Sequence, residues 1–461
     1  MGLILRNVEV AGRSGLDVRI EGGRIAAVGE RLHRAPDEIN GRGGALIPGL
    51  WDHHIHILAL AAREASLDLF AARDPDDLAR RIAEATTARP AGRWLRAVGW
   101  HEAQMGDLDR TALDRLAPDH PVRVQHQTGA LWVLNSRALA ALPAGDDPAG
   151  LDRAAGHLWR GDAWLRAKLG SKREGGLPPL APLGARLAAM GVTGLTDASV
   201  TTDATAAAGL AEAHRAGDLP QRLVLMSGGP LAAAADAAYA VGPVKVLLDD
   251  ADLIDLDDFV ARIATARRDG RAVAVHCVTA AELALTLAAF ATAGARLGDR
   301  IEHGSVIPAD AIPTLRDLGL TVVSQPAFVR ERGDRYLRET DPADRGDLYR
   351  LASLRAGGVA LAASSDAPYA APDPWAGIAA AGDRRTAAGL ALGADEALLP
   401  RAALELYLGT ARDPGGQARR VSAGAPADLV LLDRPLAQAL AEPSADAVRM
   451  TLIGGRIVHG A

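Results

Sequence analysis

Hydrophobic and polar positions alternate with a period of two near both ends of the chain. Such alternation predicts short strands, and a Gly-Gly pair within each set is typical of a hairpin turn. Because the two sets flank everything else, we predict one small β-sandwich built from both termini, residues 1–47 and 412–461. The predicted strands are residues 3–10, 16–21, 24–28, 428–432, 448–453 and 456–458, with turns at Gly22-Gly23 and Gly454-Gly455.

Between the termini, from about residue 185, the pattern changes to an apolar run, a short loop, an amphipathic helix and a glycine. The runs are apolar on both faces, as strands of a helix-covered parallel sheet must be. Eight such strands alternating with helices predict an α/β fold, a (β/α)8 TIM-type barrel over residues 48–411, with its active site at the carboxyl ends of the strands. The predicted strands are residues 46–57, 192–199, 222–227, 244–248, 272–278, 300–306, 321–326 and 359–364.

Residues 60–185 do not fit this repeat. They contain apolar runs at 94–100 and 122–127 and a helical pattern at 136–141. We interpret them as an insertion after the first barrel strand that caps the mouth of the barrel.

Composition narrows the function classes. The 461 residues are 49% hydrophobic. The net charge is −6, and the sequence has no long block of charges of one sign. Binding to nucleic acid or to a membrane surface is therefore not expected. Cys277 is the single cysteine, so no internal disulfide is possible, and the amino terminus lacks the pattern of a signal peptide. We expect a cytoplasmic protein.

Metal-competent residues lie at the ends of the predicted strands. His54 and His56 are two apart, so a strand places both imidazoles on one face. An isolated pair of this kind is more often packed or exposed than metal-binding, because short motifs are common. Here, however, other strands carry comparable residues that a closed barrel would bring to one pocket. They are Lys245, His276, His303 and Asp366.

Taken together and in this order, the motifs resemble those of the amidohydrolase superfamily. The similarity is to its large branch of cytoplasmic amide hydrolases, which includes N-substituted formamide deformylases, and it covers essentially the whole chain. The motifs are Pro48-Gly-Leu-Trp-Asp-His-His-Ile-His56, Val275-His-Cys277, Ile301-Glu-His-Gly304, Ser365-Asp-Ala-Pro368 and Ala425-Pro-Ala-Asp-Leu-Val-Leu431.

This resemblance implies a binuclear metal centre. His54 and His56 would bind one ion with Asp366, His276 and His303 would bind a second, and Lys245, carboxylated by CO2, would bridge them. Zinc is the expected metal, although iron, manganese or cobalt would fit the same ligands. A bare ammonium inside the barrel would be costly and would repel a cation. The alternative for Lys245 is a salt bridge to Asp249, which leaves a single-metal site.

Ordinary structural roles remain open for the other candidates. His276 would then be a core histidine, and Asp366 a helix cap. His303 would be structural, with Glu302 facing the helix layer in an ion pair with Arg300. All of these would have to coincide on separate barrel strands, so we favour the metal site.

The resemblance also implies a mechanism. A metal lowers the pKa of bound water to about 7, which makes hydroxide available. Asp366 would take the proton from that water as general base and pass it to the leaving nitrogen as general acid. Asp52, Glu302 and Ser365 are expected to support the ligands.

Substrate contacts are less defined by the sequence. Gln325 ends the seventh strand and is expected to hydrogen-bond the substrate. Arg330 and Arg332 follow in a loop, where they either clamp a substrate carboxylate or are solvated. Aromatic residues are only 3% of the chain, so their positions near the mouth are suggestive, although core packing is the ordinary explanation. These aromatic residues are Trp100, Trp132 and Tyr369.

His126 is a further candidate, because it precedes a segment that resembles a substrate-side segment of the family. Family members often carry a histidine where Ala130 stands in this chain, which puts that contact in doubt.

The leading hypothesis is a hydrolase that uses a metal-bound hydroxide to cleave a non-peptide C–N amide bond of a small molecule. A deaminase of a heterocyclic amine is the first alternative, which Lys245 disfavours. A non-catalytic barrel scaffold is the second alternative, which the full ligand set disfavours. A homodimer is expected on base rates.

Overall fold

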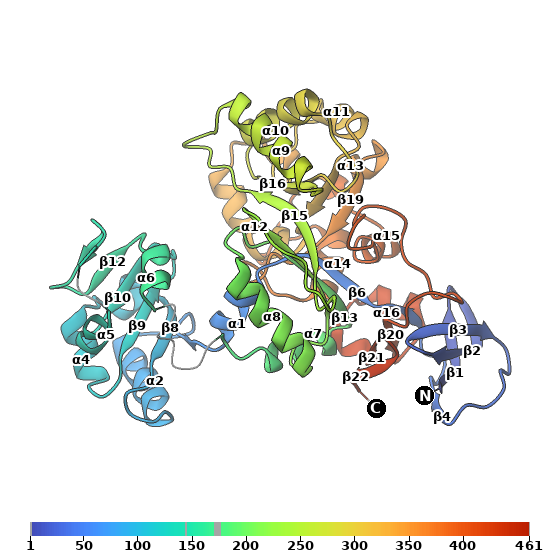
Figure 1. Ribbon diagram of the computed structural model, residues 1–461, viewed down its shortest axis with the longest axis horizontal. Coiled ribbons are helices and arrows are strands. Elements are labelled where there is room, and N and C mark those ends of the chain that lie inside the picture. Colours follow the sequence, from blue (N-terminus) through green and yellow to red (C-terminus); the bar gives the residue numbers. More distant parts are fainter. Residues whose placement is uncertain (1, 143–144, 170–176, 461) are drawn as a thin grey trace. The chain divides into compact units, whose positions relative to one another are not determined.

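The structure is a computed structural model that describes residues 2–142, 145–169 and 177–460 (Figure 1). Contacts within the chain divide it into two compact units. The first comprises residues 1–57 and 180–461, and the second comprises residues 58–179. The first contains a barrel and a β-sandwich, and the second is called the inserted unit below.

Eight parallel strands of the first unit form one sheet, in which spatial order follows chain order from β6 to β19. The two ends of the sheet meet, because the backbone N–H of Asp366, just after β19, donates to the carbonyl of His54 in β6 at 2.8 Å. This arrangement confirms the predicted TIM-type barrel. Its strands are β6 (Leu50–Ile55), β13 (Val192–Asp197), β14 (Arg222–Ser227), β15 (Ala240–Val246), β16 (Val273–Cys277), β17 (Arg300–His303), β18 (Thr321–Ser324) and β19 (Ala360–Ala363).

Helices cover the outer face of the barrel. Strand residues such as Val275 and Ile301 share a buried core with helix residues such as Phe259 and Phe290. Glycines end several helices as predicted, and Gly217 does so in the left-handed conformation with φ of 82°. The helices are α7 (Ala181–Ala189), α8 (Ala204–Ala216), α9 (Leu256–Arg268), α10 (Ala280–Ala293), α11 (Ala311–Asp317), α12 (Ala327–Glu339), α13 (Ala352–Ala356), α14 (Pro374–Asp383) and α15 (Pro400–Glu405), with 3-10 turns at Arg345–Asp347 and Ala394–Glu396.

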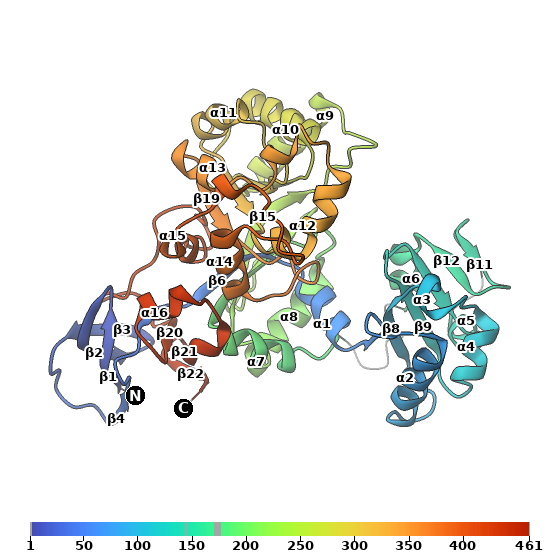
Figure 2. The same cartoon turned by 180° about the vertical axis from the view of Figure 1, so that it is seen from behind.

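The sandwich consists of two four-stranded sheets, one mainly from each end of the chain (Figure 2). Leu5 and Val18 of one sheet and Leu431 and Met450 of the other are fully buried in one shared core. The predicted sandwich of both termini is therefore confirmed. Its strands are β1 (Gly2–Val10), β2 (Arg13–Glu21), β3 (Arg24–Gly29), β4 (Asp37–Asn40), β5 (Leu46–Pro48), β20 (Leu429–Leu432), β21 (Val448–Ile453) and β22 (Arg456–His459), with α16 (Leu436–Ala441) and a 3-10 turn at Ala445–Ala447.

The predicted first barrel strand, residues 46–57, is two strands rather than one. Its first part, β5, pairs antiparallel with β20 of the sandwich, and its second part, β6, pairs with β13 of the barrel. Gly49 separates them and lies so close to Thr193 that a Cβ on Gly49 would be 2.2 Å from the threonine side chain. The chain therefore passes from sandwich to barrel at a residue that has no side chain.

The inserted unit contains a six-stranded mixed sheet in the order β11-β12-β10-β9-β8-β7, packed with helices around its own buried clusters. Helix α1 (Ile57–Glu64) precedes the sheet in the chain. That the inserted unit caps the mouth of the barrel remains a prediction. The elements are β7 (Leu67–Asp68), α2 (Pro75–Thr87), β8 (Leu95–Trp100), α3 (Glu102–Met105), α4 (Arg110–Leu116), β9 (Val122–His126), β10 (Leu131–Leu134), α5 (Ser136–Ala141), β11 (Leu151–Asp152), β12 (His157–Trp159) and α6 (Asp162–Leu169).

Within the described ranges, none of the helices combines the length and apolar character that a bilayer crossing requires.

Candidate metal centre

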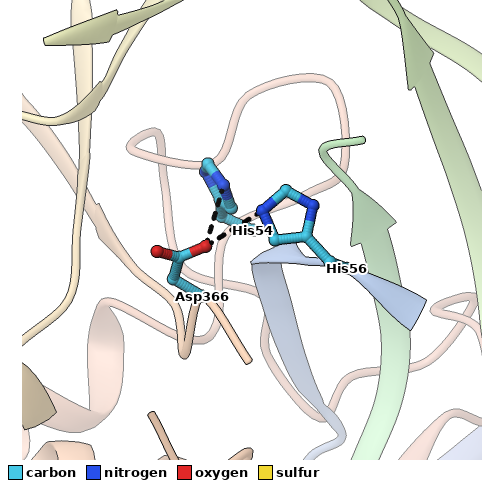
Figure 3. Close-up of side chains that lie close together, drawn as sticks. All are labelled: His54, His56 and Asp366. Atoms are coloured by element: carbon cyan, nitrogen blue, oxygen red, sulfur yellow. Dashed lines mark ion pairs between the residues drawn. The ribbon is translucent and has the colours of Figure 1, made fainter. Parts of the chain in front are cut away.

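Three of the predicted metal ligands meet at the carboxyl end of the barrel. His54 lies in β6 and His56 directly after it. Their Nε2 atoms are 3.3 and 3.1 Å from the same Oδ1 atom of Asp366, and Figure 3 shows both imidazoles directed at this carboxylate. These three residues therefore offer three ligand atoms that are close enough to hold one ion.

The backbone helps to bring Asp366 to this position. The residue follows β19 with φ of 54°, a conformation that a non-glycine residue rarely adopts. Its N–H donates to the carbonyl of His54, and the N–H of His56 donates to the carbonyl of Ala367. Asp366 is therefore held by strand β6 itself and does not cap a helix.

Hydrogen bonds at Nδ1 fix both imidazole rings. The Nδ1 atom of His54 contacts a carboxylate oxygen of Glu302, and that of His56 lies 3.0 Å from the hydroxyl of Ser199. With Nδ1 engaged, Nε2 remains as the atom that faces Asp366. Ser199 was not anticipated from the sequence, although its position just after β13 placed it at the same end of the barrel.

His276 and His303 lie beside this group. The ring centroids of His303 and His54 are 4.8 Å apart, and those of His276 and His303 are 4.6 Å apart. The four histidines predicted to gather in the barrel therefore form a chain of neighbouring rings.

Strand β17 departs from regular alternation at His303. Arg300 and Glu302 form a fully buried ion pair, while Ile301 between them packs in the outer core. Regular alternation would direct the side chain of His303 outward, like that of Ile301. The φ of 71° at His303 instead turns its side chain into the barrel, on the same side as Glu302. The suggestion that Glu302 faces the helix layer is therefore wrong, since Glu302 contacts His54 inside the barrel.

Lys245 is buried with an exposed fraction of 4%. Its Nζ has no hydrogen-bond partner among the described residues, and no ion pair between Lys245 and Asp249 occurs in that part of the chain. Burial lowers the pKa of the lysine, although Glu302 and Asp366 act in the opposite direction. The structure thus leaves a buried amine with an unsatisfied polar atom next to the acidic groups of the site.

Opposing effects determine the charges in the centre. Burial and Lys245 lower the pKa of His54, but Glu302 and Asp366 outweigh them and raise it. Burial favours protonation of Asp366, but the neighbouring histidines, His54 above all, hold its pKa well below the usual range. The carboxylate of Asp366 is therefore ionised at neutral pH.

Asp52 and Ser365 support the ligands as expected. Asp52 accepts hydrogen bonds from the backbone N–H of His54 at 3.2 Å and of Ser365 at 3.1 Å, and from the Ser365 hydroxyl. Burial raises the pKa of Asp52 to about 6, although these hydrogen bonds oppose the shift. Asp52 thus ties the β6 strand to the loop that carries Asp366.

Gln325 does not have the position expected of a substrate contact. It is fully buried, its Oε1 lies 2.9 Å from Nδ1 of His303, and its Nε2 donates to the carbonyl of Val323 and the hydroxyl of Ser364. Because the amide is already occupied, Gln325 orients His303 instead.

The two predicted arginines also differ from expectation, because they lie in helix α12 rather than in a loop. Arg330 pairs with Asp383 at 3.3 Å. Arg332 lies over the ring of Phe328 and donates to the carbonyl of Tyr369 at 2.7 Å. The exposed ring of Tyr369 is 5.8 Å from that of His56, so Tyr369 is the predicted aromatic that the structure places beside the ligands.

The remaining predicted residues belong to the inserted unit. Trp100 and Trp132 are each 3% exposed, and their indole N–H groups donate to Gly106 and Asp162 within that unit. Core packing therefore explains both tryptophans, which corrects their assignment to a binding surface.

His126 is partly exposed and lies 2.9 Å from the carboxylate of Glu102. With His101, these residues form a second group whose spacing would admit an ion. The Nδ1 atom of His101 already accepts a hydrogen bond from the backbone N–H of Ala103 at 3.1 Å, however. This weakens the group as a metal site.

Comparisons with known proteins agree with this geometry. The model of the Amidohydrolase family matches residues 37–459. The N-substituted formamide deformylase of Arthrobacter pascens is 24% identical over 93% of this chain and 92% of its own length. A putative amidohydrolase of Bacillus subtilis is 33% identical, but the match covers 27% of this chain and only 25% of that protein.

Solved structures show the same fold. An uncharacterized metal-dependent hydrolase from Pyrococcus furiosus superposes with a TM-score of 0.79 over 94% of this chain and 99% of its own, at 21% identity. N-isopropylammelide isopropylaminohydrolase from Burkholderia multivorans gives 0.54 at 18% identity, covering 99% and 98%. With the family model matching nearly the whole length, the chain belongs to the Amidohydrolase family.

Proposed function

We propose that the chain is a metal-dependent hydrolase that cleaves a non-peptide C–N bond, specifically the amide bond of a small molecule. The observation that carries this proposal is the approach of His54, His56 and Asp366 to one point at the carboxyl end of the barrel. The full-length similarity to a protein named as an N-substituted formamide deformylase supports the amide class.

The donor set fits a divalent cation. Imidazole nitrogen and carboxylate oxygen are preferred zinc ligands, and iron, manganese and cobalt accept them as well. His54, His56 and Asp366 would hold one ion, and His276 and His303 a second. When bound, such an ion makes water acidic enough to supply a nucleophile near pH 7 and polarises a carbonyl oxygen. Zinc is the metal we propose.

Lys245 fits the role of a carboxylated bridge. Among the residues that the structure describes, none is a hydrogen-bond partner of its buried Nζ, and burial favours the neutral amine that attacks the carbon of CO2. A nitrogen–carbon bond forms, one C–O π bond breaks and a proton leaves, which gives an anionic group with two oxygens. Carboxylation would replace the buried amine with an anion, and this anion would compensate the positive charge of the bound metal ions.

Asp366 is the group we propose for proton transfer. Its ionised carboxylate accepts a proton from the attacking water and then donates it to the nitrogen that departs as the C–N bond breaks. An N-substituted formamide would yield formate and an amine, with one water consumed. Tyr369, beside His56, would provide an aromatic wall for the substrate, whereas a contact from His126 remains a prediction.

The proposal is tested by activity on a panel of N-substituted formamides and other small amides, with zinc-loaded and chelator-treated protein. We expect release of amine that is lost on chelation and restored by metal. Glu405→Gln would serve as a control, because Glu405 pairs with Arg355 away from the ligands.

Asp366→Asn tests the proton-transfer role. General acid–base catalysis contributes about 10²–10⁴-fold, so we expect kcat to fall by that order. Asp383→Asn, which removes the partner of Arg330, should leave kcat near that of the wild type. Amide turnover that survives both chelation and Asp366→Asn would refute the proposal.

Adding heterocyclic amines to this panel separates the alternatives. Release of ammonia from heterocyclic amines without cleavage of any amide would identify a deaminase. Protein purified without metal that also takes up none would support a scaffold. Location in the cytoplasm and assembly as a homodimer remain predictions from the sequence.

A further inference from the structure

The candidate metal histidines differ in the charge of the group behind them. His54 has a carboxylate, Glu302, at its Nδ1 atom. His303 has a neutral amide oxygen, from Gln325, at 2.9 Å. Both partners are fully buried, so water screens neither contact.

Glu302 is held as an anion by its surroundings. Its other carboxylate oxygen accepts from Nε of Arg300, and Nη2 of Arg300 donates to the carbonyl of His53 at 3.0 Å. The guanidinium on one carboxylate oxygen and the imidazole on the other stabilise the ionised form of this buried acid. A full negative charge therefore sits behind His54.

Gln325 is fixed just as firmly as a neutral acceptor. Its Nε2 donates to the carbonyl of Val323 at 3.2 Å and to the hydroxyl of Ser364 at 3.0 Å. These two acceptors orient the amide so that Oε1 faces His303. The neighbour at His303 thus provides a hydrogen bond of the same kind without the charge.

We propose that the two metal positions have unequal affinity, and that Glu302 makes the position of His54, His56 and Asp366 the tighter one. A carboxylate behind a ligand histidine raises the basicity of its metal-binding nitrogen. The same position also contains Oδ1 of Asp366, which lies 3.3 and 3.1 Å from the imidazoles of His54 and His56, whereas the other oxygen of Asp366 is 3.9 Å from His303. This inference rests on the proposed function, since it presupposes that these residues bind metal.

Metal titration of the whole protein tests the inference without an activity assay. Metal-free protein is titrated with Zn²⁺ against a chelating indicator, and we expect two affinity classes. Glu302→Gln keeps an acceptor for Nδ1 of His54 and removes only the charge. Mutation of such a partner typically costs about 10–100-fold in metal affinity, so the tighter class should weaken by that factor while the weaker class changes less than threefold.

Glu302→Gln leaves the buried charge of Arg300 without its anionic partner, which can destabilise the fold. The double variant Arg300→Gln/Glu302→Gln removes both charges and should reproduce the weakened tighter class in folded protein, judged by circular dichroism. Glu405→Gln removes the charge of a carboxylate that pairs with Arg355 instead of supporting a histidine, and it should leave both affinity classes unchanged. Gln325→Glu, the reverse exchange, should narrow the gap between the classes.

The outcomes separate this inference from the proposed function. A selective loss of the tighter class in the Glu302 variants supports it. Equal affinities in the wild type, or equal weakening of both classes by Glu302→Gln, overturn it while leaving a metal enzyme in place. A wild-type protein that binds no divalent metal overturns both.

Discussion

At the scale of single residues, the centre depends on side chains that leave the regular geometry of their strands. His303 and Asp366 both have positive φ, a conformation that costs about 1–3 kcal/mol for each residue and persists only where the surroundings impose it. Here the backbone N–H of Asp366 donates to the carbonyl of His54, and the ring of His303 is hydrogen-bonded to Oε1 of Gln325. These two candidate ligands are therefore positioned by their neighbours as much as by the sheet.

Cys277 illustrates the opposite case, a reactive side chain that the fold keeps inert. It is 1% exposed, and burial raises the pKa of its thiol to about 12. Because the thiolate is the reactive form, we predict that iodoacetamide at pH 8 leaves folded protein unlabelled. Mass spectrometry should show one adduct only after unfolding in guanidinium chloride, since the chain has a single cysteine. Rapid labelling of folded protein would contradict this account.

At the scale of elements, the passage from β5 to β6 joins the sandwich to the barrel through Gly49. The backbone N–H of this glycine donates to the carbonyl of Asp428 at 2.8 Å, and its Cα faces the side chain of Thr193. Strand β6, which carries His54, is thereby anchored at its amino end.

Gly49→Ala should therefore destabilise the protein. A Cβ at this position would lie 2.2 Å from atoms of Thr193, and overpacking of this kind typically costs about 1–3 kcal/mol. Urea unfolding followed by circular dichroism would measure the loss. Gly346→Ala provides the matched control, because a Cβ there would meet nothing within 4 Å. An equal effect of both changes would show that the close contact at Gly49 is not the cause.

Periodicity in the sequence was sufficient for the barrel strands after the first and for six strands of the sandwich, because a buried parallel strand and a half-buried hairpin differ in pattern, but it missed β4. It failed at residues 46–57, where two adjoining strands of different sheets read as one apolar run. It also failed to predict that Glu302 and His303 both face the barrel interior, since period-two alternation does not foresee the turn at His303. The expected support from Glu302 is nevertheless present, because its carboxylate contacts Nδ1 of His54. Contacts between distant elements, such as that of Ser199 with His56, are not specified by the local pattern, which places Ser199 only at the same end of the barrel.

At the scale of the whole molecule, the chain forms two compact units, one of them continuous in sequence. The inserted unit, residues 58–179, has its own sheet and its own buried clusters. A segment with an independent core can fold alone.

We therefore predict that residues 58–179 expressed alone fold cooperatively. The expected result is a sigmoidal thermal transition by circular dichroism and dispersed amide signals by NMR. Residues 180–300, a segment of similar size that contains only part of the barrel sheet, would serve as the comparison and should lack both features. A disordered spectrum for residues 58–179 would show that this unit depends on the rest of the chain.

The sandwich that unites both ends of the chain has a consequence for biosynthesis. Strand β5 pairs with β20, and the buried face of β1 and β2 packs against β20 and β21. While the ribosome is still translating the barrel, the early strands have emerged but their partners have not yet been made. Until translation passes residue 453, the apolar faces of these early strands are therefore either exposed to solvent or shielded by a chaperone.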